Sequence, residues 1–406
     1  MPDPRRYDRA VVYLLFLRSQ AIRARLGYVA LYTAVGALFP YIPVYYSSLG
    51  LDLGAIGLLA AIFSAAGMLG SPLWGAAGDR WGRSRAVLLI PAALAALAFG
   101  ALALTRTTWV VAIAAATASF GMAGVGPVLD ARALETVQDD RSRFGRLRVW
   151  GSISFIASAL FVGWLADWAG IRSLFIVLIP ALLVTGIVGL GLRSRSDEPT
   201  LPRLGSLAAV FRSSLLMRFV AAALVVWTAN SAINAFFSVY LVRIGAPSTL
   251  VGWAWAIGAA VEVPLMFAFP VLSRRLGLER LIVIGAAFFV ARAAAVTLVT
   301  DPLLATFTMA LHGAAFSLML VGCVAYVSRH APSGAAASAQ GVLSAMIFGL
   351  SMIIGPELGG LLAGRLGLSG MFAIAGVGSA AGVIGLAWLL APALGRVPTA
   401  VTVPEA

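Results

Sequence analysis

The sequence predicts an all-α membrane protein with twelve membrane-spanning helices in two pseudo-symmetric six-helix bundles. Three observations support this fold class. Of the 406 residues, 61% are hydrophobic and only 11% are charged, whereas a soluble domain carries roughly 25% charged residues. Apolar stretches long enough to cross a bilayer recur along the whole chain. The two halves also resemble each other at a constant offset. This composition excludes a soluble enzyme, a disordered chain and a secreted disulfide scaffold.

Twelve apolar stretches of about 18 residues or more are predicted to be membrane spans. Glycine and proline interrupt many of them, and membrane helices tolerate both residues. The predicted spans are residues 27–47, 54–75, 86–105, 108–134, 149–167, 172–192, 215–242, 249–272, 281–300, 302–328, 337–363 and 368–391.

The segments outside the spans complete the predicted organisation. Residues 10–17 are apolar but too short to span, and no small-residue cleavage site follows them. We therefore predict an interfacial helix there rather than a signal peptide. The predicted parts are a cytoplasmic N-terminal segment at 1–26, a first bundle at 27–192, a cytoplasmic linker at 193–214, a second bundle at 215–391 and a cytoplasmic tail at 392–406.

The positive charge of the chain gives its predicted orientation. The net charge is +13, and all 29 basic residues are arginine. With the N-terminus inside, 22 arginines fall in cytoplasmic segments and four in outside loops. The positive-inside rule thus places both termini in the cytoplasm, with the chain as a multi-pass protein of the inner cell membrane. The remaining three, Arg132, Arg148 and Arg292, lie at or within spans. We expect no nucleic-acid partner.

An internal repeat links the two halves. Gly50, Gly57 and Tyr45 each match an identical or equivalent residue 195 positions later, at Gly245, Gly252 and Tyr240. Duplication of a six-helix unit is how many secondary transporters are built, and the substrate site then lies at the midplane between the halves.

The loop after the second predicted span carries a family motif. The segment WGAAGDRWGRSR (74–85) resembles the signature loop of the major facilitator superfamily. The resemblance implies cytoplasmic gate contacts by Asp79, Arg80 and Arg83. The loop after the eighth span keeps an arginine at the last matching position, Arg280, but has Arg274 in place of the acidic residue.

Seven titratable residues fall at or within the predicted spans. A charge inside the bilayer is costly, so each is a candidate functional residue. The seven are Asp130, Arg132, Arg148, Glu262, Arg292, His312 and Glu357.

Three of these residues lie roughly mid-span in consecutive helices: Glu262, Arg292 and His312. A carboxylate, a guanidinium and an imidazole can form one network that binds and releases a proton as helices shift. The other reading is a purely structural buried ion pair. Asp130 and Arg148 can likewise pair across the fourth and fifth spans, unless Arg148 only ends the preceding run of arginines.

A narrower resemblance covers three segments. FGRLRVWGSISF (144–155), GAAVEVPLMF (258–267) and LHGAAFSLMLVGC (311–323) are similar to helices 5, 8 and 10 of the sugar/proton and nucleoside/proton symporter branch. This resemblance implies that Asp130, Arg148 and Glu262 contact substrate. It also implies that Arg292 and His312 serve proton coupling.

The sequence departs from that branch at several positions. The helix 10 carboxylate of the sugar symporters is Ala315 here, and that of the nucleoside symporters is Ser317. By elimination, Glu262 with His312 is the predicted proton site. Four further residues are candidates for substrate binding. Ser152, Phe155 and Asn230 look closer to the nucleoside symporters. Phe316, like Phe155, is an aromatic residue predicted to face the cavity.

The leading hypothesis is proton-coupled uptake of a small polar solute, such as a sugar or nucleoside, by alternating access. The alternatives are a proton-coupled antiporter that exports drugs or metabolites, an aromatic-acid/proton symporter, and a non-transporting receptor built on the same fold. An enzyme is not expected, because the chain has no P-loop, no metal-ligand cluster and no nucleophile–base motif. The expected partners are a small-molecule substrate, the proton and membrane lipids. We expect a monomer with no metal and no cofactor. The proton gradient is the expected driving force for transport.

Overall fold

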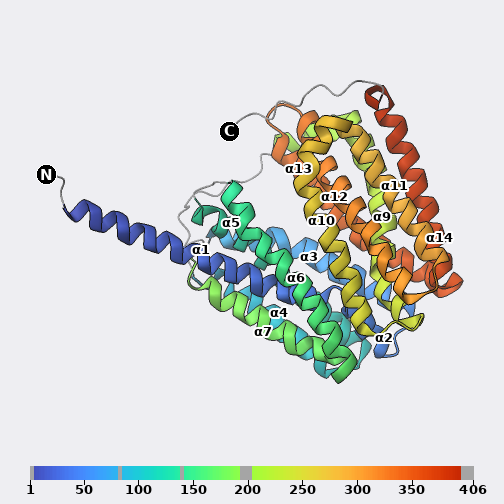
Figure 1. Cartoon of the computed structure of the whole chain (residues 1–406), viewed down its shortest axis with the longest axis horizontal. Helices are drawn as coiled ribbons and strands as arrows, with labels where there is room; N and C mark the ends of the chain where they lie inside the picture. The colour runs from blue at the N-terminus through green and yellow to red at the C-terminus, as the bar shows by residue number, and fades with distance from the viewer. Residues whose placement is uncertain (1–3, 81–84, 138–140, 193–203, 395–406) are drawn as a thin grey trace. The chain divides into compact units, whose positions relative to one another are not determined.

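The structure is a computed structural model, and it describes residues 4–80, 85–137, 141–192 and 204–394. All regular elements among these residues are helical (Figure 1). Helices satisfy their own backbone hydrogen bonds, which an apolar membrane environment requires.

Most helices of the N-terminal half begin and end within a few residues of the predicted spans, but α1 and α6 begin well before theirs. They are α1 (Pro4–Leu38), α2 (Ile42–Ser48), α3 (Leu53–Arg80), the short 3-10 turn η1 (Arg85–Val87), α4 (Leu89–Leu104), α5 (Thr108–Thr136), α6 (Arg141–Ala169), the 3-10 turn η2 (Ile171–Ser173) and α7 (Leu174–Gly189).

The C-terminal half begins with a short helix and ends with a long one. Its elements are α8 (Leu204–Arg212), α9 (Ser214–Arg243), α10 (Ser248–Leu276), α11 (Leu278–Leu298), α12 (Pro302–His330), α13 (Ala336–Ser344), the π-helical segment η3 (Ala345–Leu350) and α14 (Ser351–Leu394).

Among the described residues, ten helical segments are long and apolar enough to cross a membrane, and α4 is a shorter apolar helix. The tenth segment, Ala336–Leu394, covers the last two predicted spans. Gly367, with φ 74°, interrupts its helical geometry. Gly170 has φ 83° at the corresponding turn between the fifth and sixth predicted spans. The all-helical membrane fold is confirmed, while the count of twelve and the cytoplasmic termini stay predictions.

The structure changes or adds to three predicted segments. The first predicted span, 27–47, is divided between α1 and α2 around Pro40, which lacks the N–H that a continuing helix needs. Residues 10–17, predicted as a separate interfacial helix, lie within the continuous helix α1. The predicted linker contains the helix α8, and its residues 193–203 lie outside the described residues.

The chain divides into two compact units that depart in one respect from the predicted bundles. The first unit is Met1–Ile42 with Ala65–Pro199, and the second is Pro43–Ser64 with Thr200–Ala406. Residues 43–64, predicted in the first bundle, therefore group with the second unit. A Cβ on Gly57 would lie 2.4 Å from the Pro356 carbonyl oxygen. The backbones of α3 and α14 touch there, as small residues allow in membrane proteins.

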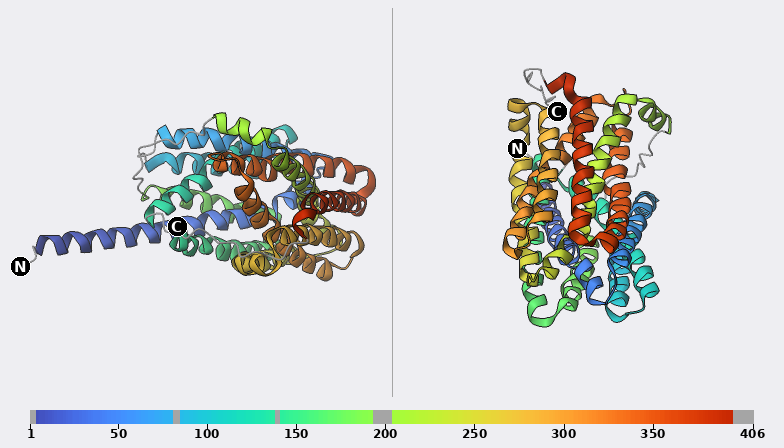
Figure 2. Two further views of the ribbon diagram at one scale, coloured as in Figure 1. Left: turned by 90° about the horizontal axis from the view of Figure 1, so that it is seen from above. Right: turned by 90° about the vertical axis from the view of Figure 1, so that its right-hand side faces the viewer.

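The packing inside each unit repeats. In the first unit, α1 packs on α6 and α7, and α4 packs on α5 and α7. In the second unit, α9 packs on α14 (Figure 2), and α11 packs on α12 and α14. Gly367 divides α14 into two spans. The packing of α9 on α14 therefore corresponds to that of α1 on α6 and α7, and the packing of α11 on α12 and α14 corresponds to that of α4 on α5 and α7. Gly50 and Gly245, 195 residues apart, also share a positive φ of 82° and 94°. The packing and these turns support the predicted duplication.

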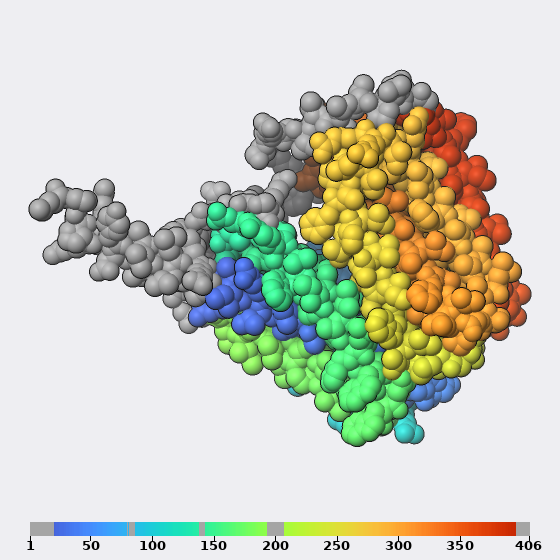
Figure 3. Space-filling model, in the orientation of Figure 1, coloured from blue at the N-terminus to red at the C-terminus, as the bar shows by residue number. Residues whose placement is uncertain are grey.

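Large apolar side chains lie exposed along the spans. Leu97, Leu104 and Trp388 are between 74% and 89% exposed. Figure 3 shows α10 running along the near face of the second unit. Phe267 of this helix is also exposed. A soluble monomer rarely exposes so much apolar surface. Lipid is the environment that such side chains suit.

The closest approach of α14 to α9 gives a stability prediction. A Cβ on Gly355 would lie 1.9 Å from the Ser231 hydroxyl oxygen and 2.5 Å from the Thr228 carbonyl oxygen. Overpacking of this kind costs about 1–3 kcal/mol. We therefore expect Gly355→Ala to lower the melting temperature in detergent. Gly364→Ala is the matched control, because nothing lies within 4 Å of its Cβ position. Equal melting temperatures for the two variants would contradict the packing described here.

Candidate functional site

The centre of the second unit holds a fully buried cation, Arg292 of α11. Its Nη1 donates to Asn230 Oδ1 at 3.1 Å and to Asn234 Oδ1 at 2.7 Å. The ring of Phe237 lies 5.1 Å from the guanidinium carbon, within cation–π range. These three residues of α9 are spaced four and three positions apart, so they share one helix face. A guanidinium has only donors, and α9 supplies two of the acceptors that it needs.

The helix α12 approaches Arg292 from another side. Arg292 Nη1 lies 3.1 Å from His312 Nδ1, and Nη2 donates to the Met309 sulfur at 3.3 Å. Because arginine cannot accept a hydrogen bond, His312 Nδ1 must be the acceptor. The imidazole is therefore neutral, with its proton on Nε2. The structure thus brings together Arg292, His312 and Asn230, which the sequence analysis predicted as coupling and substrate residues.

Aromatic rings surround this cluster. The His312 ring lies 5.7 Å from that of Phe316 and 6.0 Å from that of Phe289, centroid to centroid. Trp227 packs edge-on against both phenylalanines and tilts against Phe348 of η3. Phe316, predicted to bind substrate, is partly accessible beside the histidine. The cluster therefore combines a buried cation with flat apolar faces.

The position of Glu262 is fixed through the packing of α10 on α12. A Cβ on Gly313 would lie 2.3 Å from the Gly258 carbonyl oxygen, so the two backbones touch. A Cβ on Gly258 would in turn lie 3.9 Å from His312 Cδ2. Glu262 follows Gly258 by one helical turn and is partly exposed. The carboxylate predicted as part of the proton site thus belongs to the helix that lies against His312.

The first unit holds the second predicted pair, and tyrosines of α1 contact both charges. The Tyr28 hydroxyl donates to Asp130 Oδ1 at 2.6 Å. Arg148 Nη2 donates to the Tyr32 hydroxyl, and its guanidinium carbon lies 4.1 Å from the centre of that ring. Each member of the predicted Asp130–Arg148 pair is therefore contacted by one of two tyrosines that lie one turn apart on α1. Two further candidates, Ser152 and Phe155, lie partly exposed on α6 in the turns after Arg148.

The third arginine of the spans has a structural partner. Arg132 is buried and donates to the carbonyl of Leu192, just beyond α7. Arg23 donates to the neighbouring Gly191 carbonyl at 2.8 Å. In the second unit, Arg280 donates two hydrogen bonds to the Leu394 carbonyl, at the end of α14. Positive groups stabilise the C-terminal ends of helices. These arginines therefore hold the last helix of each half.

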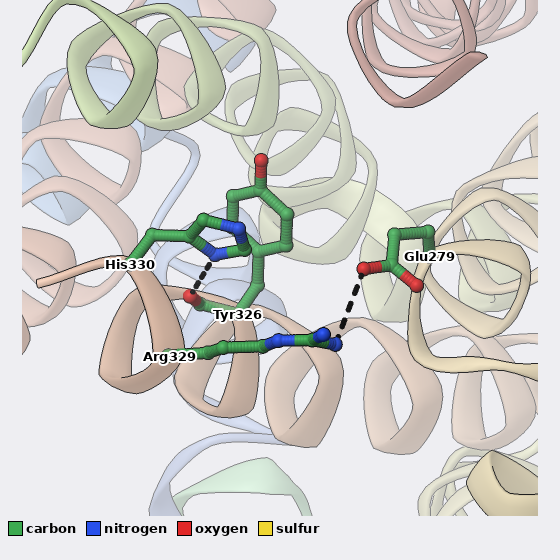
Figure 4. A network of polar contacts seen from close by, with 4 residues as sticks. All are labelled: Glu279, Tyr326, Arg329 and His330. Atoms are coloured by element: carbon green, nitrogen blue, oxygen red, sulfur yellow. Dashed lines mark hydrogen bonds and ion pairs between the residues drawn. The ribbon is translucent and has the colours of Figure 1, made fainter. Parts of the chain in front are cut away.

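The predicted gate lies partly outside the described residues. Asp79 and Arg80 are the last residues of α3, with the Arg80 side chain exposed, and Arg83 falls in the segment 81–84. Figure 4 shows a polar network at the corresponding end of the second unit. There Arg329 lies 3.7 Å from Glu279, and His330 Nδ1 donates to the Tyr326 carbonyl at 2.9 Å. This network joins the start of α11 to the end of α12.

Comparison with known proteins gives the family. A model of the MFS_1-like family matches residues 22–374. The chain belongs to the MFS_1-like family. It is a major facilitator superfamily transporter and a multi-pass integral membrane protein, not an enzyme.

Similar proteins support a resemblance to sugar and nucleoside symporters. Maltose permease of Geobacillus stearothermophilus is 28% identical over 364 residues, which is 88% of this chain and 92% of that protein. A probable 3-phenylpropionic acid transporter of Escherichia coli is 26% identical, over 84% of this chain and 91% of that protein. The solved structure of the nucleoside transporter NupG superposes with a TM-score of 0.77 at 18% identity, over 93% of this chain and all of that one. This last likeness shows the shared fold.

Sequence reasoning missed several members of the two clusters in this MFS_1-like transporter, among them Tyr28, Asn234 and Phe237. A usable signal was present for two of them. Asn234 follows Asn230 by four residues, and Tyr28 precedes Tyr32 by four, so each pair shares a helix face. Paired polar residues at this spacing in an apolar span indicate a common partner.

The asparagine–arginine contact gives a second stability prediction. Asn234→Leu removes the 2.7 Å acceptor from a buried cation, at a cost of about 1–3 kcal/mol. In an Arg292→Met background there is no cation to satisfy, so the same change should cost much less. Melting temperatures of the two single variants and the double variant in detergent measure the difference. Additive effects would show that Asn234 does not stabilise Arg292.

Proposed function

We propose that this transporter takes up a small polar solute, such as a sugar or nucleoside, together with a proton by alternating access. The observation that carries the proposal is the contact between Arg292 and a neutral His312 in the apolar interior of the second unit. Titratable residues inside a span are costly and mark ion or substrate pathways. A purely structural helix contact would not need them.

The Arg292–His312 contact suggests how a proton acts. His312 Nδ1 accepts from Arg292 and cannot also carry a proton. A proton that binds to Nδ1 turns the imidazole into a second cation facing the first. The contact between α11 and α12 must then open, because both groups are donors. Proton binding at His312 is thus linked to a helix movement, as coupled transport requires.

The first unit offers groups that suit a polar solute. Asp130 is exposed although it lies within a predicted span. A carboxylate that faced hydrocarbon would be strongly disfavoured, so we infer that Asp130 faces water. Arg148 and Tyr32 lie beside it with donors and an aromatic face for hydroxyl groups or a ring. The names of a sugar permease and a nucleoside transporter among the similar proteins agree with such a solute.

A second candidate is an aromatic-acid/proton symporter. The similar protein from Escherichia coli is named a probable 3-phenylpropionic acid transporter. Arg292 and the rings of Phe316 and Phe289 would suit a carboxylate and a phenyl group respectively.

Flux in proteoliposomes tests the proposal. Purified protein is reconstituted, the outside is acidified, and labelled maltose, uridine and 3-phenylpropionate are offered in turn. One pH unit can support roughly tenfold accumulation of a neutral solute carried with one proton. We expect accumulation of at least one solute, and its loss when a protonophore is added. Export of solute against its own concentration gradient, driven by inward proton flow, would instead indicate an antiporter.

Variants locate the coupling site within the same assay. Without a proton carrier, the solute should only equilibrate, so Glu262→Gln and His312→Ala should abolish accumulation but still allow exchange. Asp52→Asn is the control, because Asp52 lies between α2 and α3 and its side chain accepts the Ala55 N–H at the start of α3. Wild-type accumulation by both Glu262→Gln and His312→Ala would contradict the coupling site.

A further inference from the structure

The hydrogen bonds of Arg292 are unevenly distributed over its guanidinium group. Three strong acceptors share Nη1: the two asparagine oxygens and the His312 nitrogen. Among the residues that the structure describes, Nη2 has only the weak sulfur acceptor of Met309. The buried Nε has no hydrogen-bond partner among them. The edge formed by Nε and Nη2 therefore lacks any strong acceptor.

The charge of Arg292 is also uncompensated. Every described group within hydrogen-bonding distance of its guanidinium is neutral. The Phe237 ring covers one face, and the residue is fully buried. A cation buried in the apolar interior is normally paired with a negative charge, because an unpaired buried ion is strongly unfavourable. The site thus lacks one negative charge and two hydrogen-bond acceptors.

We propose that the Nε–Nη2 edge of Arg292 binds the carboxylate of the transported solute. Two parallel N–H groups match the two oxygens of a carboxylate in a bidentate pair. One negative charge neutralises the cation without excess, which a phosphate dianion would not. The inference rests on the proton-coupled transport proposed above, and it assigns the solute to the acids, such as a sugar acid or an aromatic acid, rather than to the neutral sugars and nucleosides.

The burial of Arg292 gives this binding a mechanical consequence. The guanidinium is fully enclosed by α9, α11 and α12. A carboxylate reaches it only when these helices separate, so binding favours a different conformation from the one described. A ligand shifts a conformational equilibrium by its difference in affinity for the two states. The carboxylate pairs with the charge of Arg292 only in the opened conformation, and this pairing supplies the difference in affinity between the two conformations.

Thermal melting of the purified protein in detergent tests the site with matched ligands. Sodium glucuronate is compared with glucose, and sodium 3-phenylpropionate with 3-phenylpropanol, so that each pair differs by its carboxylate. We expect at least one carboxylate to raise the melting temperature of the wild type and its neutral partner not to do so. An equal rise with sodium chloride would mean that a free inorganic anion fills the edge, and would overturn the assignment to the solute.

Variants of Arg292 complete the test. Arg292→Gln should remove the response to the carboxylate, and Arg292→Lys should remove it too, because a lysine has the charge but not the fork. Arg365→Gln, an exposed arginine of α14, should respond as the wild type does. Responses that survive in both Arg292 variants would place the anion elsewhere and overturn the proposal.

The melting temperatures separate this proposal from the proposed function. These measurements need no transport. A failure of proton-driven uptake with an intact carboxylate response would therefore refute only the proposed function.

Discussion

The enclosure of one guanidinium group by neutral acceptors is the constraint on which the interior of the second unit depends. Arg292 cannot be deprotonated under ordinary conditions and has five donors to satisfy. In a membrane span no bulk water is at hand to satisfy them. Two asparagines of α9 and a histidine of α12 converge on α11 for this reason. The positions of three helices are thus tied to a single charge, and any movement among them changes its hydrogen bonds.

The first unit meets the same constraint in another way. Its helices pair as those of the second unit do, which reflects the duplication. Its charges, however, are held by tyrosines of α1 rather than by amides: Tyr28 on Asp130, and Tyr32 on Arg148. The backbone repeat has therefore kept the packing while the polar groups of the two halves diverged. One unit carries both signs of charge near the surface, and the other carries a buried cation.

The fold could be predicted from the sequence because membrane spans leave a strong signal in composition and length. The family motif at 74–85 and the constant offset between Gly50 and Gly245 predicted the arrangement of the spans in two similar halves. The partners of the charges were harder to predict. A helix that is apolar all round gives little indication of which side faces the bundle interior. Arg292 and His312 were predicted together, whereas Asn234 and Tyr28 were missed although each lies four residues from another polar residue of the same helix. Residues 43–64 were placed in the first bundle because chain order cannot show that Gly57 touches α14.

The account makes Arg292 and His312 the place where solute and proton meet. The most direct measurement is the number of protons exchanged when solute binds to purified protein in a weakly buffered solution with a pH indicator. A carboxylate bound beside Arg292 neutralises the charge that repels a proton from His312. The account therefore predicts proton uptake on binding of a carboxylate solute to the wild type, and none in Arg292→Gln or His312→Ala. Binding without proton exchange in the wild type, or undiminished uptake in both variants, would contradict it.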